Sequence, residues 1–412
     1  MPQKVVITGI GTINPLGKSV SESWENAVKG ISGVSLITLV DPSDMLVKIA
    51  CEVKQFKAED HIPAKEVRRR DRFEIFASIA AAEAITQAGL NLEKVDPNRI
   101  GVIVASAIGG FSSMVEGLHT MINEGPRRVS PFLIPMLMSN GASGMLTIDY
   151  GFRGPSFSVA SACASGADAI GTAWMLVQSG VIDVAITGGS EATITKLGVA
   201  AFDRIGAMSR RNDDFSMTPQ PFDKNRDGLV MGEGAGILVI EREDHARKRG
   251  AEIIAELAGY SSTSDGYHIT APLENGSGGA RAIVQCLDIA GINLSDVDYI
   301  NAHGTATSLN DLSETKAIKL AFGETAYHIP VSSTKSMTGH MMGATGAVEA
   351  IFCIQSIRTD LIPPTIHYET PDPECDLDYV PNKSRETKVR IATSNAFGFG
   401  GHNAVLAFRD YN

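Results

Sequence analysis

The sequence predicts an α/β protein with largely buried sheets, because short runs rich in Val and Ile alternate with longer helical patterns along the whole chain. Its 412 residues can bury a sizeable core. This length corresponds to roughly two to three domains, or to one large duplicated domain. The chain is 43% hydrophobic and 20% charged, which is typical of a compact globular protein and excludes a disordered one.

Seven runs are predicted to be strands, because each is bounded by Gly, Pro, Asp or Ser. They are residues 4–8, 99–105, 157–160, 184–187, 236–240, 297–301 and 389–393. Four segments between them have the apolar pattern of a helix, namely residues 75–88, 164–178, 278–290 and 344–357. The best candidate for a domain boundary follows a charged helix at residues 242–249. We therefore divide the chain into residues 1–250 and 251–412.

The charges and cysteines exclude several classes of protein. With 36 basic and 47 acidic residues the net charge is −11, which argues against general nucleic-acid binding. The chain begins without an apolar signal core. Residues 129–148 are uncharged but contain prolines and glycines, so a subunit interface or a buried segment is expected there, not a membrane helix. Five widely spaced cysteines predict neither a disulfide framework nor a zinc site, and a cytoplasmic location is expected.

Cys163 is the candidate nucleophile. A strand ends near Ala160 and a helix begins near Cys163, with Ser161 as the expected N-cap. A thiol in the first helical turn faces the positive end of the helix dipole, which stabilises a thiolate. The alternative interpretation is a small buried hydrophobic residue. The helix is small and apolar on nearly every face, so it should be buried on all sides, with Asp168 as its one polar insertion.

Two further segments carry residues suited to catalysis. His303 follows a predicted strand in a loop rich in Gly and Thr, where catalytic groups often lie, although a structural histidine in a turn is an equally good interpretation. Lys335 and His340 belong to a polar stretch that precedes a helix. Glu349 falls on an apolar face of that helix, so it is either buried with Lys335 as its partner or exposed at the surface.

Near the C-terminus, residues 394–403 interleave glycines with aromatic residues, which predicts a tightly folded backbone. One interpretation is a loop that cradles a phosphate, although the spacing of a P-loop is lacking, and a purely structural Gly-rich turn is the alternative.

Taken in order, these segments resemble the β-ketoacyl-acyl carrier protein synthases of the elongating type. The resemblance covers essentially the whole chain, from residues 6–11 to residues 398–401. It includes further blocks at residues 221–224, 227–228, 232–236, 335–340 and 363–365. Each block is moderately specific, and all of them in order are highly specific. The resemblance implies a thiolase-like fold, in which two similar halves form a five-layered αβαβα arrangement, and usually a homodimer.

The resemblance also implies roles for individual residues. The family's Cys-His-His set maps onto Cys163, His303 and His340, with Lys335 and Glu349 as its conserved Lys and Glu. The oxyanion hole maps onto the amides of Cys163 and Phe399; the acyl pocket and its gate map onto Ile108, Leu133, Phe202 and Phe399; pantetheine binding maps onto Thr305 and Thr307. No metal is required, although a family site for a monovalent cation maps near Asn301, Glu349, Ser394 and Asn395.

The implied reaction is a decarboxylative Claisen condensation in fatty acid elongation. An acyl group moves to Cys163, malonyl-acyl carrier protein loses CO2, and the resulting carbanion attacks the acyl-enzyme to give a 3-oxoacyl-carrier protein. No covalent cofactor is expected, because the carrier protein brings the phosphopantetheine. One alternative is a ketosynthase of a polyketide or another specialised acyl pathway. The other is a non-catalytic partner subunit that determines chain length, which would have lost the nucleophile.

A basic run within this acidic chain suggests where an acidic carrier protein docks. We expect that surface at Lys65, Arg68, Arg69, Arg127 and Arg128, although a solvated helix face is the alternative. Four positions depart from the family's usual residues: Asp168 replaces a common His, Gly206 removes an expected cation, Ser308 replaces a common Pro, and Leu133 replaces a frequent interface aromatic.

Overall fold

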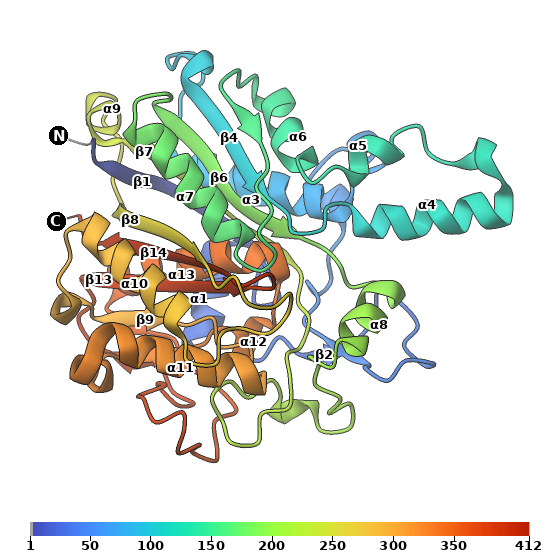
Figure 1. Cartoon of the computed structure of the whole chain (residues 1–412). Helices are drawn as coiled ribbons and strands as arrows, with labels where there is room; N and C mark the ends of the chain where they lie inside the picture. The colour runs from blue at the N-terminus through green and yellow to red at the C-terminus, as the bar shows by residue number, and fades with distance from the viewer. Residues whose placement is uncertain (1–2, 412) are drawn as a thin grey trace.

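The computed structural model describes residues 3–411 and has a mixed α/β fold around one large twisted sheet (Figure 1). Within those residues the sheet has ten strands in the order β10-β9-β13-β14-β8-β1-β7-β6-β4-β5. Their bounds are β1 Val5–Ile13, β4 Ile100–Ala105, β5 Ser156–Phe157, β6 Val184–Glu191, β7 Gly234–Arg242, β8 Ala255–Ser264, β9 Tyr299–Asn301, β10 Val331–Ser332, β13 Ile391–Gly398 and β14 His402–Arg409. Two small antiparallel pairs join β2 (Ser35–Leu36) to β3 (Ile49–Ala50) and β11 (Leu361–Ile362) to β12 (Arg385–Glu386).

The sheet consists of two halves with the same pattern of strand directions. From β1 outward, the pairs β1–β7 and β7–β6 are antiparallel, whereas β6–β4 and β4–β5 are parallel. From β8 outward, β8–β14 and β14–β13 are antiparallel, whereas β13–β9 and β9–β10 are parallel. The halves join where Val6 pairs with Glu256 and Ile7 with Ala255. This repeated pattern is the duplication that the family resemblance implied.

The helices form three layers around the two sheet halves. α3 (Arg72–Ala88) and α6 (Gly141–Tyr150) cover the outer face of the first half, and α10 (Ser277–Ala290) with α11 (Ser308–Phe322) covers that of the second. α7 (Ser165–Gln178) and α13 (Thr345–Thr359) lie between the halves and contact strands of both. The result is the expected five-layered αβαβα arrangement. The remaining helices are α1 Val20–Val28, α2 Ala64–Val67, α4 Phe111–Glu124, α5 Leu133–Leu137, α8 Lys196–Arg204, α9 Glu243–Lys248 and α12 Lys335–Thr338.

Each of the seven predicted strands overlaps an observed strand, but the sequence did not reveal β8, β10 and β14. β8 ends in Ser261, Ser262, Thr263 and Ser264, a polar run that resembles a loop. It is nevertheless a strand because β14 pairs with it along most of its length and α10 packs on it.

Among the helices, α3 begins at Arg72, earlier than predicted, because Asp71 and Glu74 form a capping box. The predicted N-cap Ser161 is wrong, since α7 begins at Ser165 and its N-cap position is Ala164, which has no side-chain cap. The uncharged stretch at residues 129–148 forms α5 and most of α6, and its apolar side chains Ile134 and Ile148 are strongly exposed. No helix within residues 3–411 is long and apolar enough to cross a membrane.

The central helices α7 and α13 approach each other closely because both carry small residues. A Cβ atom on Gly166 would lie 2.7 Å from the carbonyl oxygen of Gly343 and 3.0 Å from the amide of Ala347. A Cβ atom on Gly346 would lie 3.0 Å from the amide of Ala167. The backbones of the two helices are therefore in direct contact at this crossing.

We predict that Gly166→Ala destabilises the protein, because the added methyl group has backbone on its far side and cannot be relieved by a rotamer change. Overpacking of this kind costs about 1–3 kcal/mol. Thermal unfolding should show a lower midpoint for this variant. Gln178→Ala, in the last turn of the same helix, is the matched control and should change stability by less than about 0.5 kcal/mol. Equal midpoints for the two variants would contradict the close crossing.

Candidate active site

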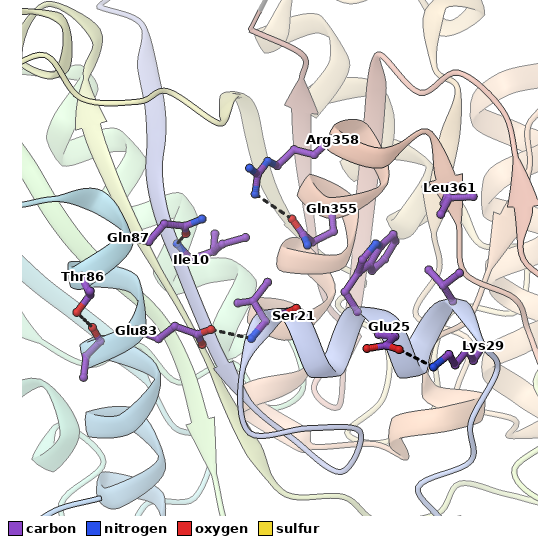
Figure 2. A pocket seen from close by; sticks show the side chains of 14 residues that line it. Ile10, Ser21, Glu25, Lys29, Glu83, Thr86, Gln87, Gln355, Arg358 and Leu361 are labelled. Carbon is purple, nitrogen blue, oxygen red and sulfur yellow. Dashed lines mark hydrogen bonds and ion pairs between the residues drawn. The ribbon is translucent and has the colours of Figure 1, made fainter.

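A cavity of about 190 Å3 lies between the two halves and brings together seven of the predicted site residues. Its lining includes Cys163, His303, His340, Phe202, Phe399, Thr305 and Thr307. A larger, open hollow of about 970 Å3 lies elsewhere, between α1, α3 and the end of α13 (Figure 2). Its described lining residues include neither a cysteine nor a histidine. The chemistry therefore belongs to the smaller cavity.

Cys163 lies in a tight turn just before α7. Ala162, which precedes it, has a φ of +52°, a left-handed conformation that non-glycine residues seldom adopt. The hydroxyl of Ser165 holds this turn by donating to the carbonyl of Ala162 over 2.6 Å and accepting from the amide of Ser161 over 2.9 Å. The turn presents the thiol to the cavity.

The sulfur of Cys163 faces two backbone amides, those of Phe399 and of Cys163 itself. Burial nevertheless raises the pKa of the thiol to about 11, and these amides oppose the shift only in part. The expected stabilised thiolate is therefore not the resting form. The helix dipole acts less strongly than predicted because α7 begins two residues after the sulfur's residue.

His303 follows β9 and His340 follows α12, and their ring centroids are 5.3 Å apart at an interplanar angle of 86°. Burial lowers the pKa of both imidazoles well below 6.5, and the positive charge of Lys335 lowers them further. Both rings are therefore neutral near pH 7. Nδ1 of His340 lies 3.0 Å from the hydroxyl of Thr345, whereas Nε2 of His340 and Nδ1 of His303 have no hydrogen-bond partner among residues 3–411.

Lys335 and Glu349 form the predicted pair. The Lys335 Nζ and the Glu349 Oε1 are 2.6 Å apart, and both side chains are only 1% exposed. Burial raises the pKa of Glu349 to about 7, against the opposing effect of Lys335. The exposed-surface alternative for Glu349 is excluded by its burial. A buried pair like this depends on both partners, since removing one leaves an uncompensated charge.

Two carboxylates hold the site, and the sequence analysis did not identify either of them. Glu314 on α11 accepts hydrogen bonds from the amides of His303, over 2.8 Å, and Gly304, over 2.7 Å. Glu191, at the end of β6, accepts from the loop after β4 and from the amide of Gly343, which follows His340. In the sequence, each of these two carboxylates could be noticed only as a charged residue on a face of a helix or strand that is otherwise buried.

Two predicted pocket residues do not line the cavity. Ile108 is 41% exposed, and Leu133 lies on α5 beside Gly117 of α4. Ile108 lies between β4 and α4, and Leu133 is the first residue of α5, so neither predicted residue lines the cavity at the thiol.

The predicted docking residues lie at the surface. Lys65, Arg68, Arg127 and Arg128 are exposed, and the guanidinium of Arg69 lies 4.9 Å from the ring centroid of Phe132. The neighbouring Arg70 and Arg72 form ion pairs with Asp149 and Glu233. Arg69 and Arg128 also form ion pairs, with Glu66 and Glu124.

The polar groups at the predicted cation position are buried. Within residues 3–411, hydrogen-bond partners are lacking for Oδ1 and Nδ2 of Asn301, Oε2 of Glu349, Oγ of Ser394 and Oδ1 of Asn395. Oxygen atoms left unpaired in a dry interior are costly, and a hard cation accepts oxygen ligands of this kind. The donor set fits the expected ion. The described residues contain no cluster of three or more His, Cys, Asp or Glu side chains that could hold a metal.

We predict that His303 and His340 destabilise the protein as the pH drops below 6.5, in opposition to Glu349, whose raised pKa has the reverse effect. The unfolded histidines then bind protons, whereas the buried His303 and His340 stay neutral. The pair contributes up to about 3 kcal/mol per pH unit to this loss. The free energy of unfolding, measured with urea at about pH 6 and pH 5, should fall less between these pH values for the double variant H303Q/H340Q than for the wild type. The exposed His328→Gln variant serves as the control, and equal losses in all three proteins would contradict the neutral pair.

Two family models match the chain. The Beta-ketoacyl synthase, N-terminal domain matches residues 2–246, and the Beta-ketoacyl synthase, C-terminal domain matches residues 254–369. Among curated proteins, the 3-oxoacyl-[acyl-carrier-protein] synthase 2 of Staphylococcus aureus (strain COL) is 51% identical over 409 residues, which cover 99% of each chain. The enzyme of the same name from Synechocystis sp. is 47% identical and covers 99% of this chain and 98% of its own.

Solved structures agree over the full length. A type II PKS acyl-carrier protein complex with its ketosynthase bound to a hexaketide has a matching chain that is 34% identical, with a TM-score of 0.92 and complete coverage of both chains. A Beta-ketoacyl synthase from Burkholderia phymatum STM815 has the same identity, TM-score and coverage. The fold, the two domain matches in order and the full-length relatives together establish that the chain belongs to the β-ketoacyl synthase family.

Proposed function

We propose that the chain is a 3-oxoacyl-[acyl-carrier-protein] synthase of type 2, which elongates fatty acids by condensing an acyl-enzyme thioester with malonyl-acyl carrier protein. The observation that carries this proposal is the meeting of one buried thiol and two neutral imidazoles in a single cavity between the halves. Curated relatives of that name, 51% and 47% identical over nearly the full chain, support it.

In the first step, Cys163 attacks the thioester carbonyl of an acyl-carrier protein. The carbon–sulfur bond to pantetheine breaks, and the thiol proton of Cys163 ends on the released pantetheine thiol. The amides of Cys163 and Phe399 stabilise the oxyanion, and each such donor is worth about 2.7–4 kcal/mol. The resting thiol is neutral, so its proton is lost as the new bond forms.

In the second step, malonyl-carrier protein loses CO2 and leaves an enolate. His303 and His340 donate hydrogen bonds to the enolate oxygen, and Lys335 favours the uncharged rings that this step uses. The enolate carbon then attacks the acyl-Cys163 carbonyl, and the sulfur leaves as a thiolate that takes up a proton. Holding both thioesters in one cavity makes this step effectively unimolecular.

Phosphopantetheine reaches the cavity on the carrier protein. We assign its contacts to the hydroxyls of Thr305 and Thr307, which line the cavity and lie 2.9 Å from each other. The rings of Phe202 and Phe399 line the same cavity and suit the acyl chain and its gate.

The two alternatives are less well supported. A polyketide ketosynthase would use the same residues, but the solved ketosynthase with a hexaketide is 34% identical, below the 51% of the fatty acid relatives. A non-catalytic partner subunit has no use for a thiol in a strained turn beside two imidazoles. We therefore retain the fatty acid enzyme.

We further propose a monovalent cation at Asn301, Glu349, Ser394 and Asn395, supported by their unpaired buried oxygens.

The division of the chain into residues 1–250 and 251–412 is kept as a proposal, supported by the two domain matches on either side of it. The five free cysteines fit a cytoplasmic location. The terminal residues of the two proposed halves, 1–2 and 412, lie outside the described residues.

We predict that the two half-reactions separate by mutation. Cys163→Ala should abolish acyl loading, measured by mass spectrometry of the intact protein, because no other described cysteine lines the cavity. Replacing both His303 and His340 by Ala should lower CO2 release from malonyl-carrier protein by at least about 100-fold. A Cys163→Ala protein that still carries an acyl group would refute the assignment, and Cys286→Ala, at a buried position outside the cavity, is the control.

A second prediction concerns carrier docking. Changing Lys65, Arg68 and Arg69 to Glu should raise the KM for acyl-carrier protein, since exposed charge sets encounter with an acidic partner. The KM for a small acyl thioester should stay the same. Changing the exposed Lys383 and Lys388 to Glu is the matched control. Equal losses with both substrates would reject this surface.

A third prediction concerns assembly. The extension made by α4 and α5 projects from the molecule (Figure 1). Together with the adjoining α6 and β5 it exposes an apolar surface, which we call the α4–α5 patch. It consists of Met114, Leu118, Met121, Ile122, Phe132, Ile134, Met138, Ile148 and Phe157. Exposed apolar surface of this extent marks an interaction site, and a second copy of this chain would cover it. Light scattering should report a dimer for the wild type and a monomer for Ile134→Glu, and a monomeric wild type would contradict the proposal.

A further inference from the structure

We propose that Asp168 is a positioning residue for Cys163, which fixes the nucleophile turn against the second half of the sheet through Ser161 and Tyr260. This inference rests on the proposed function, because it concerns the acyl-transfer step of that reaction. Asp168 takes no direct part in the steps derived above, and its position was recognised in the sequence only as a departure from a common His.

The carboxylate of Asp168 is buried, with 6% of the residue exposed, and it lies in the first turn of α7. One of its oxygens accepts a hydrogen bond from the hydroxyl of Ser161, and the other accepts from the hydroxyl of Tyr260 over 2.8 Å. No basic side chain within the described part of the chain forms an ion pair with it. Two hydroxyl groups and the positive end of a 14-residue helix therefore hold this carboxylate.

Ser161 links Asp168 to the nucleophile. It precedes Ala162, whose left-handed conformation leads directly into Cys163. Such a conformation costs about 1–3 kcal/mol and persists only where the surroundings impose it. The amide of Ser161 is held by Ser165 over 2.9 Å, and its hydroxyl is held by Asp168. The carbonyl of Ser161 also accepts from the amide of Ala164 over 3.1 Å. Asp168 thus supplies one of three restraints on Ser161 and holds its side chain.

Tyr260 links Asp168 to the other half. It lies on β8, and its ring occupies the space left by Gly171, where a Cβ atom would be 2.2 Å from the ring. Tyr260 pairs with Leu406 of β14, and the turn between β13 and β14 carries the Phe399 amide. The Ser161–Asp168–Tyr260 chain therefore spans from the residues before the thiol to the strands that hold the second amide.

The two halves also touch at the turn itself. A Cβ atom on Gly398 would lie 2.8 Å from the carbonyl oxygen of Ser161 and 3.1 Å from the amide of Cys163. A small shift of the turn would therefore change the distance between the sulfur and the Phe399 amide. Acyl transfer uses that geometry directly. The imidazoles used for CO2 release form no hydrogen bond to Asp168, Ser161 or Tyr260.

The test compares the two half-reactions in single-turnover experiments on the full-length enzyme. Asp168→Ala should slow acyl loading of Cys163 by about 10- to 100-fold, the range expected for a small misplacement of a reacting group. CO2 release from malonyl-carrier protein should change by less than about twofold, because positions without shared partners act independently. Asp168→Asn should recover most of the loading rate, since an amide accepts one hydroxyl and donates to the other. Asp288→Ala, an exposed position on α10, is the matched control.

Ser161→Ala and Tyr260→Phe decide the outcome if Asp168→Ala fails to fold. Each should reduce loading selectively, and the double variant S161A/D168A should lose no more than D168A alone, because D168A already removes the Ser161–Asp168 hydrogen bond that S161A would break. Unchanged loading, or equal losses in loading and CO2 release across these variants, would overturn the positioning role. A wild-type enzyme that accepts no acyl group would instead overturn the proposed function, and the inference with it, so the two failures are distinguishable.

Discussion

The active site depends on the contact between two halves that share only a short stretch of backbone pairing. β1 and β8 pair at two positions, and the remaining contact is made by α7 and α13, which lie between the halves and touch both. Glycine at the crossing lets these helices approach until their backbones meet. Because the thiol precedes α7 and an imidazole precedes α13, this approach sets the width of the cavity. The chemistry is therefore a property of the interface and not of either half alone.

Burial controls the charges of this interface. It holds the thiol protonated and both imidazoles uncharged, while the Lys335 ammonium stays paired with Glu349 in the same dry region. The positive charge of Lys335 favours the neutral forms of the two histidine rings. Each neutral ring keeps one N–H group, which can donate a hydrogen bond although the ring carries no charge. Stabilisation of negative charge then comes from dipoles that are already oriented, which need no reorganisation when the reaction occurs. This arrangement is consistent with a condensation that proceeds without a metal in its steps.

Much of the fold was predictable from the sequence, because buried parallel strands are rich in Val and Ile and the small-residue helix α7 has an unusual composition. β8 was not, since its Ser-rich end is held by β14, a partner more than a hundred residues away. The apolar helix face around Glu349 was enough to suggest Lys335 as its buried partner. The distance between the two charged groups could not be predicted from the sequence. Glu314 and Glu191 were not identified, because they accept hydrogen bonds from backbone amides. Nearly every residue has a backbone amide, so no residue type in the sequence points to these contacts.

The composition of α7 also has a consequence for how the protein is made. This helix is apolar on nearly every face, and the indole of Trp174 donates to the carbonyl of Leu257 on β8 over 2.9 Å. In the first half α7 packs against β4, β6 and β7, whereas α13 and β14, its neighbours from the second half, come still later in the chain. During synthesis the strands of the first half therefore cover only one side of α7, and its other apolar side stays exposed until α13 and β14 have left the ribosome. Until then we expect chaperones to bind that side.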